Sequence, residues 1–263
     1  IDTYIIRIME ITFNKRVSKG GKFNQIYLPK EMENIIEVGD LVQVKLLEKK
    51  QKIYYKNQKK LSDFKEYIVK NIFSIIEKNK EIEIAFIVGS FLEGNYNDID
   101  VVIITNNENL EKIIDSQLSK ELDQKFHVIS FNKEKLKTFI ETDPLIRSMF
   151  NNYLSNKKIN LDFNKKIDWN HLNFLLMMPE DLLDLEVSSK IYFNNLRRLI
   201  TIERFLNDKQ SSRNIILDEI LNILPENILD RIRSNEPINN KETKFIKNII
   251  KEKIKKIRSI KNG

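Results

Sequence analysis

Hydrophobic and polar positions alternate between helical and strand spacing through the middle of the chain, from Ser62 to about residue 154. After Ser62, a residue type that commonly caps helices, apolar residues recur at helical spacing at Phe64, Ile68, Ile72 and Ile75. The short apolar runs that follow are typical of buried strands. The expected elements are a helix from Ser62, strands at 82–88 and 99–105, a helix at 108–122, a strand at 126–131 and a helix from Lys133. This order predicts a small α/β unit with a mixed sheet.

The chain from about Asp168 to its end shows helical periodicity and no convincing strand pattern. Two helices have a continuous apolar face, formed by Tyr192, Leu196, Leu199, Ile202 and Leu206 in one and by Ile246, Ile250, Ile254 and Ile257 in the other. Ser211 or Ser212 is a candidate N-cap for a further helix, and Pro225 can open the next. We predict a helical bundle here.

Residues 3–47 show a pattern of short strands and turns. A turn at Gly20-Gly21 leads into a strand that ends at Leu28, and Pro29 opens a short helix. A second turn, Gly39-Asp40, leads into a partly alternating strand over 41–47.

Residues 48–61 carry six lysines around Tyr54 and Tyr55, which is typical of a solvated linker. Basic residues beside aromatic ones can also hold single-stranded nucleic acid. Together these patterns predict an α+β protein. Its predicted parts are a β-domain at 1–50, a basic linker at 51–61, an α/β domain with a mixed sheet at 62–160 and a helical domain at 161–263.

The composition of the chain excludes several kinds of catalytic and metal-binding site. The chain of 263 residues has no cysteine and two histidines, His127 and His171. This excludes disulfides, thiolate zinc sites, iron–sulfur clusters, cysteine nucleophiles and multi-histidine metal sites. The sequence has no apolar run long enough to span a bilayer and no signal-peptide pattern, so we expect a cytoplasmic protein without membrane contact.

The net charge of +7 is concentrated at one end of the chain. Residues 237–263 hold nine Lys or Arg against two Asp or Glu, so the rest of the chain is neutral. A basic tail and a basic linker allow contact with nucleic-acid phosphates. The alternative for the tail is a surface helix packed on the bundle.

The stretch IVGSFLEGNYNDIDVVIIT, residues 87–105, combines a glycine turn with two carboxylates. A strand ends at Gly89-Ser90, where a glycine lets the backbone approach a bulky anion and the following amides can bind phosphate. Asp98 and Asp100 are two residues apart at the start of the next strand, so both side chains point to one face. Adjacent carboxylates repel unless a cation lies between them, and oxygen ligands suit Mg²⁺, which in turn binds phosphates. The pattern indicates metal-assisted nucleotidyl transfer.

These residues resemble the signature of the DNA polymerase beta-type nucleotidyltransferase superfamily, in particular its minimal members. The matching positions are Val88-Gly89-Ser90, Gly94 and Asp98-Ile99-Asp100-Val101, within a resemblance that covers about residues 62–154. The resemblance implies that Asp98 and Asp100 are catalytic and hold Mg²⁺, and that Gly89, Ser90 and Gly94 bind a nucleoside triphosphate. It implies an enzyme that moves a nucleoside monophosphate to a hydroxyl of an RNA end such as tRNA, a protein side chain or a small molecule.

Two positions depart from the family pattern. The family places a third carboxylate on a later strand, where this chain has His127. His127 would serve as a general base or as a structural histidine, and Asp123, just before the strand, is an alternative third acid. Glu93 stands where relatives often carry a basic residue.

The predicted helical region offers further cations for a bound nucleotide. Lys190, Arg197, Arg198 and Arg204 fall on one predicted helix. We expect Lys190 and Arg197 to bind the triphosphate, and solvated helix charges are the alternative for this set.

Residues 3–47 resemble the AbrB-like swapped-hairpin family. The matching residues are Lys19-Gly20, Ile26, Leu28-Pro29-Lys30-Glu31 and Val38-Gly39-Asp40. The resemblance implies an intertwined homodimer and DNA binding, or an accessory domain that only dimerises. It also motivates an alternative function, a catalytically degenerate nucleotidyltransferase fold that acts as a DNA-binding regulator or nucleotide sensor. A monomer in which this segment covers a sheet edge of the α/β domain is the competing expectation.

Overall fold

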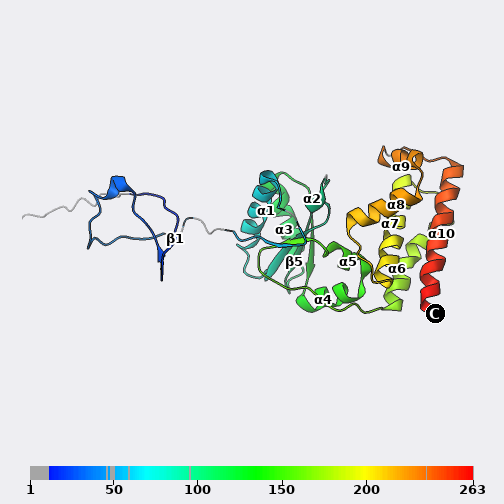
Figure 1. Ribbon diagram of the computed structural model, residues 1–263, viewed down its shortest axis with the longest axis horizontal. Coiled ribbons are helices and arrows are strands. Elements are labelled where there is room, and N and C mark those ends of the chain that lie inside the picture. Colours follow the sequence, from blue (N-terminus) through cyan, green and yellow to red (C-terminus); the bar gives the residue numbers. More distant parts are fainter. Residues whose placement is uncertain are drawn as a thin grey trace, which may run out of the picture. The chain divides into compact units, whose positions relative to one another are not determined.

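The computed structural model describes residues 12–45, 47, 51–58, 60–94, 96–234 and 236–262. The chain divides into two compact units, Ile1–Lys49 and Lys50–Gly263 (Figure 1). The first unit has a two-stranded sheet, and the second has a five-stranded mixed sheet and the helical C-terminal region. This confirms the predicted α+β fold, while the domain boundaries stay predictions.

The first unit contains the predicted glycine turn but shorter strands than expected. Strands β1 (Ser18–Lys19) and β2 (Asn24–Gln25) pair antiparallel around Gly20, whose amide donates to the carbonyl of Phe23. The short helix expected after Pro29 is a single 3₁₀ turn, η1 (Lys30–Met32). Residues 3–11 of the predicted β-domain lie outside the described residues.

The strand predicted over 41–47 is wrong for the part that is described, because residues 41–45 have no strand hydrogen bonding. None of the described residues of this unit is buried, and Val38, Leu41 and Val44 are among its exposed apolar side chains. About 45 residues are too few to enclose a core, and a strand requires a partner edge that a single copy does not provide here.

The second unit is built on a sheet with the strand order β3-β7-β4-β5-β6. The pairs β3–β7, β7–β4 and β4–β5 are antiparallel, and β5–β6 is parallel. The strands are β3 (Tyr54–Lys56), β4 (Ile84–Val88), β5 (Ile99–Ile104), β6 (Phe126–Phe131) and β7 (Tyr153–Ser155). The three predicted strands are therefore confirmed as β4, β5 and β6, and β3 and β7 were not predicted.

Strand β3 corrects the interpretation of residues 51–61 as a linker. Tyr54–Lys56 pairs with Tyr153–Ser155 and forms one edge of the sheet. The side chain of Asn57 donates to the carbonyl of Asn151 directly after this strand. A lysine-rich sequence is compatible with this position, because charged residues are common on edge strands.

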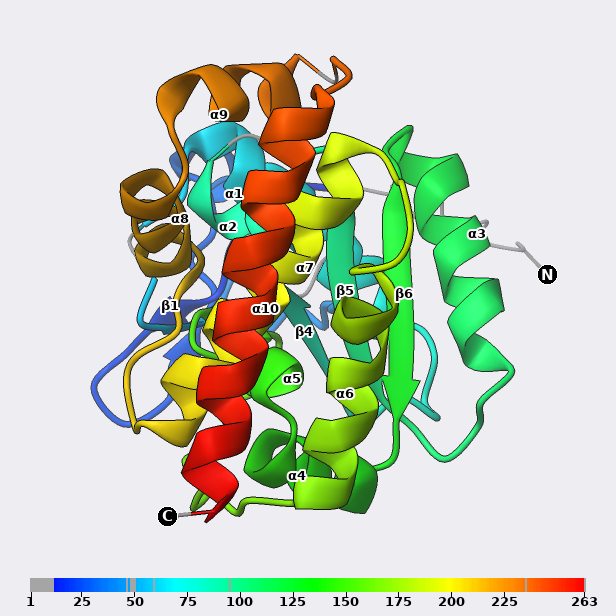
Figure 2. The ribbon, with the colours of Figure 1, turned by 90° about the vertical axis from the view of Figure 1, so that its right-hand side faces the viewer.

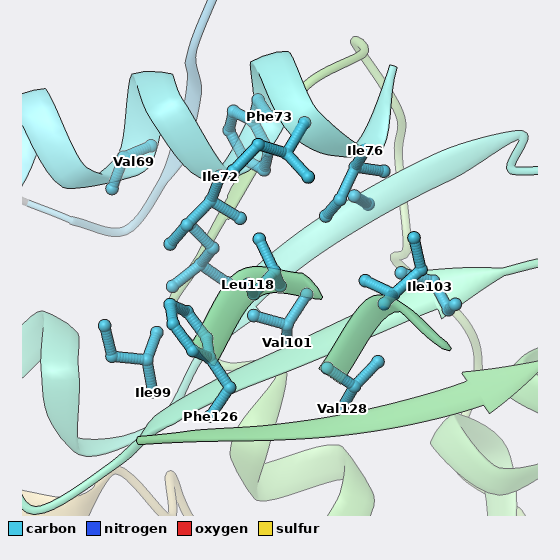
Figure 3. Packing of buried hydrophobic residues seen from close by; sticks show 14 of the residues in the cluster. Val69, Ile72, Phe73, Ile76, Ile99, Val101, Ile103, Leu118, Phe126 and Val128 are labelled. Carbon is cyan, nitrogen blue, oxygen red and sulfur yellow. The ribbon is translucent and has the colours of Figure 1, made fainter. Parts of the chain in front are cut away.

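One face of the sheet is covered by α1 (Asp63–Ile76) and α3 (Leu110–Leu122). Figure 3 shows the side chains of α1 lying over those of β5 and β6. As predicted, Ser62 caps α1, and its hydroxyl accepts from the Lys65 amide. Phe64, which we expected on the buried face, is exposed, and Val69 and Phe73 are buried instead.

The opposite face is covered by α4 (Lys133–Thr142) and α5 (Pro144–Met149). Its core joins alternate residues of β4 and β5, such as Phe86, Val88 and Val102, to aromatic residues near β7. Each central strand is thus buried on both faces, which explains why these strands have continuous apolar runs.

The helical region confirms the predicted bundle. The predicted apolar faces of α7 and α10 are buried, and α10 runs along the bundle in Figure 2. Ser212 and Pro225 occupy the N-cap positions of α8 and α9. None of the described helices has the length and apolar content that a membrane span requires. The helices are α6 (Trp169–Asp181), α7 (Ser189–Leu206), α8 (Arg213–Ile223), α9 (Glu226–Arg233) and α10 (Asn240–Asn262).

Candidate active site

A glycine turn connects β4 to the short helix α2 (Ser90–Glu93). Gly89 caps this helix with φ 78°, a conformation that side chains other than glycine rarely adopt. A Cβ at this position would overlap Oδ2 of Asp100 and lie 3.2 Å from its Cγ. Glycine is therefore required here both by the backbone conformation and by the carboxylate beside it.

The Asp100 carboxylate lies next to this turn. It is on the sheet face that α4 and α5 cover at a greater distance from the turn. Val88 of β4, Asp100 of β5 and His127 of β6 are direct neighbours in the strand register, so their side chains share one face. Asp98 directly precedes β5. Burial raises the pKa of the Asp100 carboxyl, the hydrogen bond with His127 lowers it, and the charge of Asp98 raises it, with a net rise above its usual range. The structure thus brings Asp98 and Asp100 together.

His127 occupies the place where the resemblance predicts a third carboxylate. Its Nδ1 lies 3.2 Å from Oδ1 of Asp100, and its side chain is 61% exposed. Asp123 ends α3 in the left-handed conformation and precedes the first register pair between β5 and β6. Of the two, His127 is the one in register with Asp100.

Two side chains, one from α1 and one from the segment before it, donate hydrogen bonds to backbone carbonyls of α2 and Gly94. Lys65 Nζ donates to the carbonyls of Phe91 and Gly94, the latter at 2.9 Å, and lies 5.1 Å from the ring centroid of Phe91. Gln58 Nε2 donates to the carbonyl of Leu92 at 2.9 Å. Sequence reasoning missed both residues, since a lysine and a glutamine in a lysine-rich stretch carry no signal of such a contact.

One cation of the helical region, Arg213, acts on a carboxylate of this site. Burial lowers the pKa of the half-buried Arg197 guanidinium on α7, and the charge of Arg213 on α8 lowers it further. The charge of Arg213 also acts on Asp100. Lys190, by contrast, is exposed near the start of α7. Arg213, which the sequence did not single out, is thus close enough to Asp100 and to Arg197 for their charges to interact, whereas no contact joins Arg197 to the carboxylates among the described residues.

Asp98 and Asp100 are the candidate metal ligands of this site. Within the part of the chain that the structure describes, no group of three or more Asp, Glu or His side chains could hold a metal ion. Two shallow hollows, one beside α3 and one beside α4, include none of the residues discussed above. A metal here would therefore need additional ligands, such as the phosphates of a substrate.

Comparison with known proteins agrees with this geometry. Residues 70–143 match the family model described as Polymerase beta, Nucleotidyltransferase. The matched region includes the glycine turn, both aspartates and His127, and it ends before α7 and α8. No curated protein and no solved structure matches the chain. The α/β part of the chain is therefore a nucleotidyltransferase domain of the DNA polymerase beta-type superfamily.

Proposed function

We propose that the protein transfers a nucleoside monophosphate from a nucleoside triphosphate to a hydroxyl acceptor, with Mg²⁺ as cofactor. The observation that supports this most directly is the packing of Gly89 against Asp100 with Asp98 beside it. A turn that can bind phosphate and a carboxylate pair that can bind a cation are thereby adjacent. We also propose a cytoplasmic location, where nucleoside triphosphates are available.

The residues fit a magnesium ion that shares its coordination with a substrate. Asp98 and Asp100 would hold the ion, because the repulsion between the two carboxylates would be relieved by a cation between them. When bound, Mg²⁺ supplies positive charge against the phosphate oxygens during transfer. The amides after Gly89, together with Ser90, would contact the triphosphate.

We propose that His127 accepts the proton of the acceptor hydroxyl. In this step the hydroxyl oxygen bonds to the α-phosphorus, the bond from that phosphorus to the bridging oxygen breaks, and pyrophosphate leaves. The proton passes to the imidazole, and the adjacent Asp100 carboxylate stabilises the imidazolium that forms. His127 replaces a carboxylate as base in this proposal.

The test is to incubate the full chain with each labelled nucleoside triphosphate, Mg²⁺ and separate RNA, protein and small-molecule fractions. The fraction that becomes labelled identifies the acceptor class. Asp98→Asn and Asp100→Asn should each reduce labelling by on the order of 100-fold or more. Asp123→Asn is the matched control and should retain labelling, because Asp123 is exposed and outside the strand register. Undiminished labelling by the Asp98 and Asp100 variants would contradict the proposal.

A second candidate function is that of a catalytically degenerate nucleotidyltransferase fold that acts as a DNA-binding regulator or as a nucleotide sensor. The observation that favours it is a histidine in the register position of the expected third acid. The AbrB-like unit would then bind DNA through basic residues such as Lys15, Lys19 and Lys22, with binding that weakens as salt rises. Salt-sensitive DNA binding by the full chain without turnover of any triphosphate would support this candidate over the enzyme.

A further inference from the structure

The last helix, α10, carries two sets of lysines that differ in their surroundings. On its inner side, Lys253 pairs with Glu203 at 2.6 Å and with Glu219 at 3.0 Å, and Lys256 also pairs with Glu203. The second set is exposed, and none of its ammonium groups pairs with a carboxylate of the described part of the chain. This set, the lysine row, consists of Lys241, Lys244, Lys251 and Lys255.

The lysine row lies along one face of the helix. Lys244, Lys251 and Lys255 are separated by seven and four residues, and such spacings bring side chains to the same face of an α-helix. Lys241 lies one turn before Lys244, so that the row is about 21 Å long. Among the described residues of α10, Glu252 is the one exposed acid. This face therefore has a net positive charge, which attracts a polyanion.

The opposite face of α10 narrows the kind of polyanion that fits. Ile246, Ile250, Ile254 and Ile257 are buried in the core of the bundle, and Figure 2 shows α10 running along the outside of the bundle in front of α7. An amphipathic helix that binds a membrane surface inserts its apolar face between the lipids. In α10 the bundle already covers that face, so a membrane would contact the lysines alone.

An aromatic side chain lies beside the lysine row. Phe245 is 42% exposed, and it follows Lys241 by four residues, which makes the two side chains neighbours on the helix surface. Lysines beside an exposed aromatic ring suit single-stranded nucleic acid, since the ammonium groups attract the phosphates and a base stacks on the ring. Lysine contacts phosphate as a point charge, without the paired donors by which arginine reads guanine. The surface therefore suits a single strand of any sequence.

We propose that the lysine row of α10, with Phe245 beside it, binds single-stranded nucleic acid through its phosphates and through stacking of a base. The surface belongs to the second unit of the chain, whereas the AbrB-like segment belongs to the first. This inference goes beyond nucleotidyl transfer and does not require it. Binding that depends on the row without any transfer would end only the enzymatic proposal, and transfer without such binding would end only this one.

The experiment measures binding of the full chain to a fluorescent, unstructured RNA by anisotropy over a range of salt concentrations. DNA of the same sequence and its duplex are the comparison probes. The variant replaces three lysines of the row by glutamine at once, and it should weaken RNA binding about 10-fold or more at low salt. The slope of log affinity against log salt concentration should fall by about 2, because three phosphate contacts are lost. The substitutions are Lys244→Gln, Lys251→Gln and Lys255→Gln.

The matched control makes the same change in net charge on the α/β domain. It replaces three exposed lysines by glutamine and should keep the salt slope of the unaltered chain. Phe245→Leu should weaken binding of the single strands about 5-fold or more and of the duplex less, with the slope unchanged, since a stacked base is lost and no charge is removed. The control substitutions are Lys80→Gln, Lys112→Gln and Lys120→Gln.

The inference is overturned if the triple variant of the row, folded by circular dichroism, keeps the RNA affinity and salt slope of the unaltered chain. It is also overturned if the control variant loses as much, or if Phe245→Leu binds the single strands unchanged. Vesicles containing phosphatidylserine test the membrane alternative. Binding to them as tight as to RNA, and lost in the same triple variant, would assign the row to a membrane instead. Should the triple variant not fold, Lys251→Gln with Lys255→Gln decides by the same criteria.

Discussion

At the scale of single residues, Asp100 is a position where function and stability oppose each other. Burial raises its pKa, and the charge of Asp98 acts in the same direction. Between the ordinary pKa of an aspartate and this raised value, the folded chain binds more protons than the unfolded chain. Stability therefore falls as the pH rises through that window.

We predict that Asp100→Asn raises the melting temperature at neutral pH while it abolishes transfer. The gain should shrink as the pH is lowered through the pKa of Asp100, because the carboxyl of the unaltered chain then becomes neutral too. Thermal melts from pH 4 to pH 8 measure this, with Asp123→Asn, at an exposed aspartate, as the control variant. A lower melting temperature for Asp100→Asn at pH 7 would contradict the argument.

Lys65 shows how a residue outside the reacting atoms positions the site. Burial lowers the pKa of its ammonium group, which donates hydrogen bonds to two backbone carbonyls of the glycine-turn region. Lys65→Met should destabilise the chain by about 1–2 kcal/mol in urea unfolding, because those carbonyls lose a charged donor. It should also raise KM for the triphosphate more than it lowers kcat, since the turn is loosened rather than removed. Lys70→Met, on the same helix with a surface pair to Glu66, is the control, and equal effects of the two variants would refute a positioning role.

At the scale of elements, lysines of the last helix, α10, form ion pairs with other helices of the bundle. Lys253 of α10 contacts Glu203 of α7 and Glu219 of α8, and Lys256 also pairs with Glu203. Burial on its own would raise the pKa of Glu203, but the hydrogen bonds from both lysines bring it below its usual value. This favours the packed surface helix over a free basic tail for this part of α10.

We predict that Lys253→Met lowers the free energy of unfolding by about 1.5–3 kcal/mol, because Glu203 and Glu219 each lose one charged hydrogen-bond donor and keep only Lys256 and Arg204, respectively. The depressed pKa of Glu203 adds stability above the ordinary pKa of a glutamate, and that stability is lost as the pH falls. The difference between variant and unaltered chain should therefore narrow in acid. Lys251→Met, which removes an exposed lysine of the same helix, should be nearly neutral in the same urea titrations. A loss for Lys253→Met no larger than that of this control would show that the ion pairs contribute little.

At the scale of the whole molecule, the first unit exposes the side chains that a partner would cover. Ile26, Leu28, Val42 and Val44 are all exposed in the single chain. We propose a homodimer through residues 3–47, in which these side chains are buried against their copies around a two-fold axis. The AbrB-like resemblance stays a prediction and supports the same arrangement.

Light scattering on the full chain and on residues 51–263 tests the dimer. The shorter chain keeps β3 and should be a monomer that retains measurable nucleotidyl transfer, because the second unit has its own cores. The full chain should be a dimer at micromolar concentration. A monomeric full chain would rule out the interface, and a dimer that survives the truncation would place the interface in the second unit.

Much of the fold follows from local pattern. Hydrophobic periodicity and cap residues indicate burial and helix ends within a few residues of sequence. They predicted the strands β4, β5 and β6, the cap at Ser62, a helix start at Ser211 or Ser212, and the buried faces of α7 and α10. The glycine turn and the two aspartates were predicted for a similar reason. Their chemistry depends on residues that are near one another in the sequence, and the family match includes them.

The tertiary structure alone decided which distant residues complete the site and the sheet. The sequence pattern indicated a linker at β3 and no strand at β7. Both strands have three residues, which is too short to show a hydrophobic period, and they form because a neighbouring strand pairs with them. Lys65, Gln58 and Arg213 were not recognised for a related reason. Lys65 and Gln58 act through hydrogen bonds to residues far away in the sequence, and Arg213 acts through its charge on Asp100. No local pattern of charge or hydrophobicity distinguishes such side chains from solvated ones.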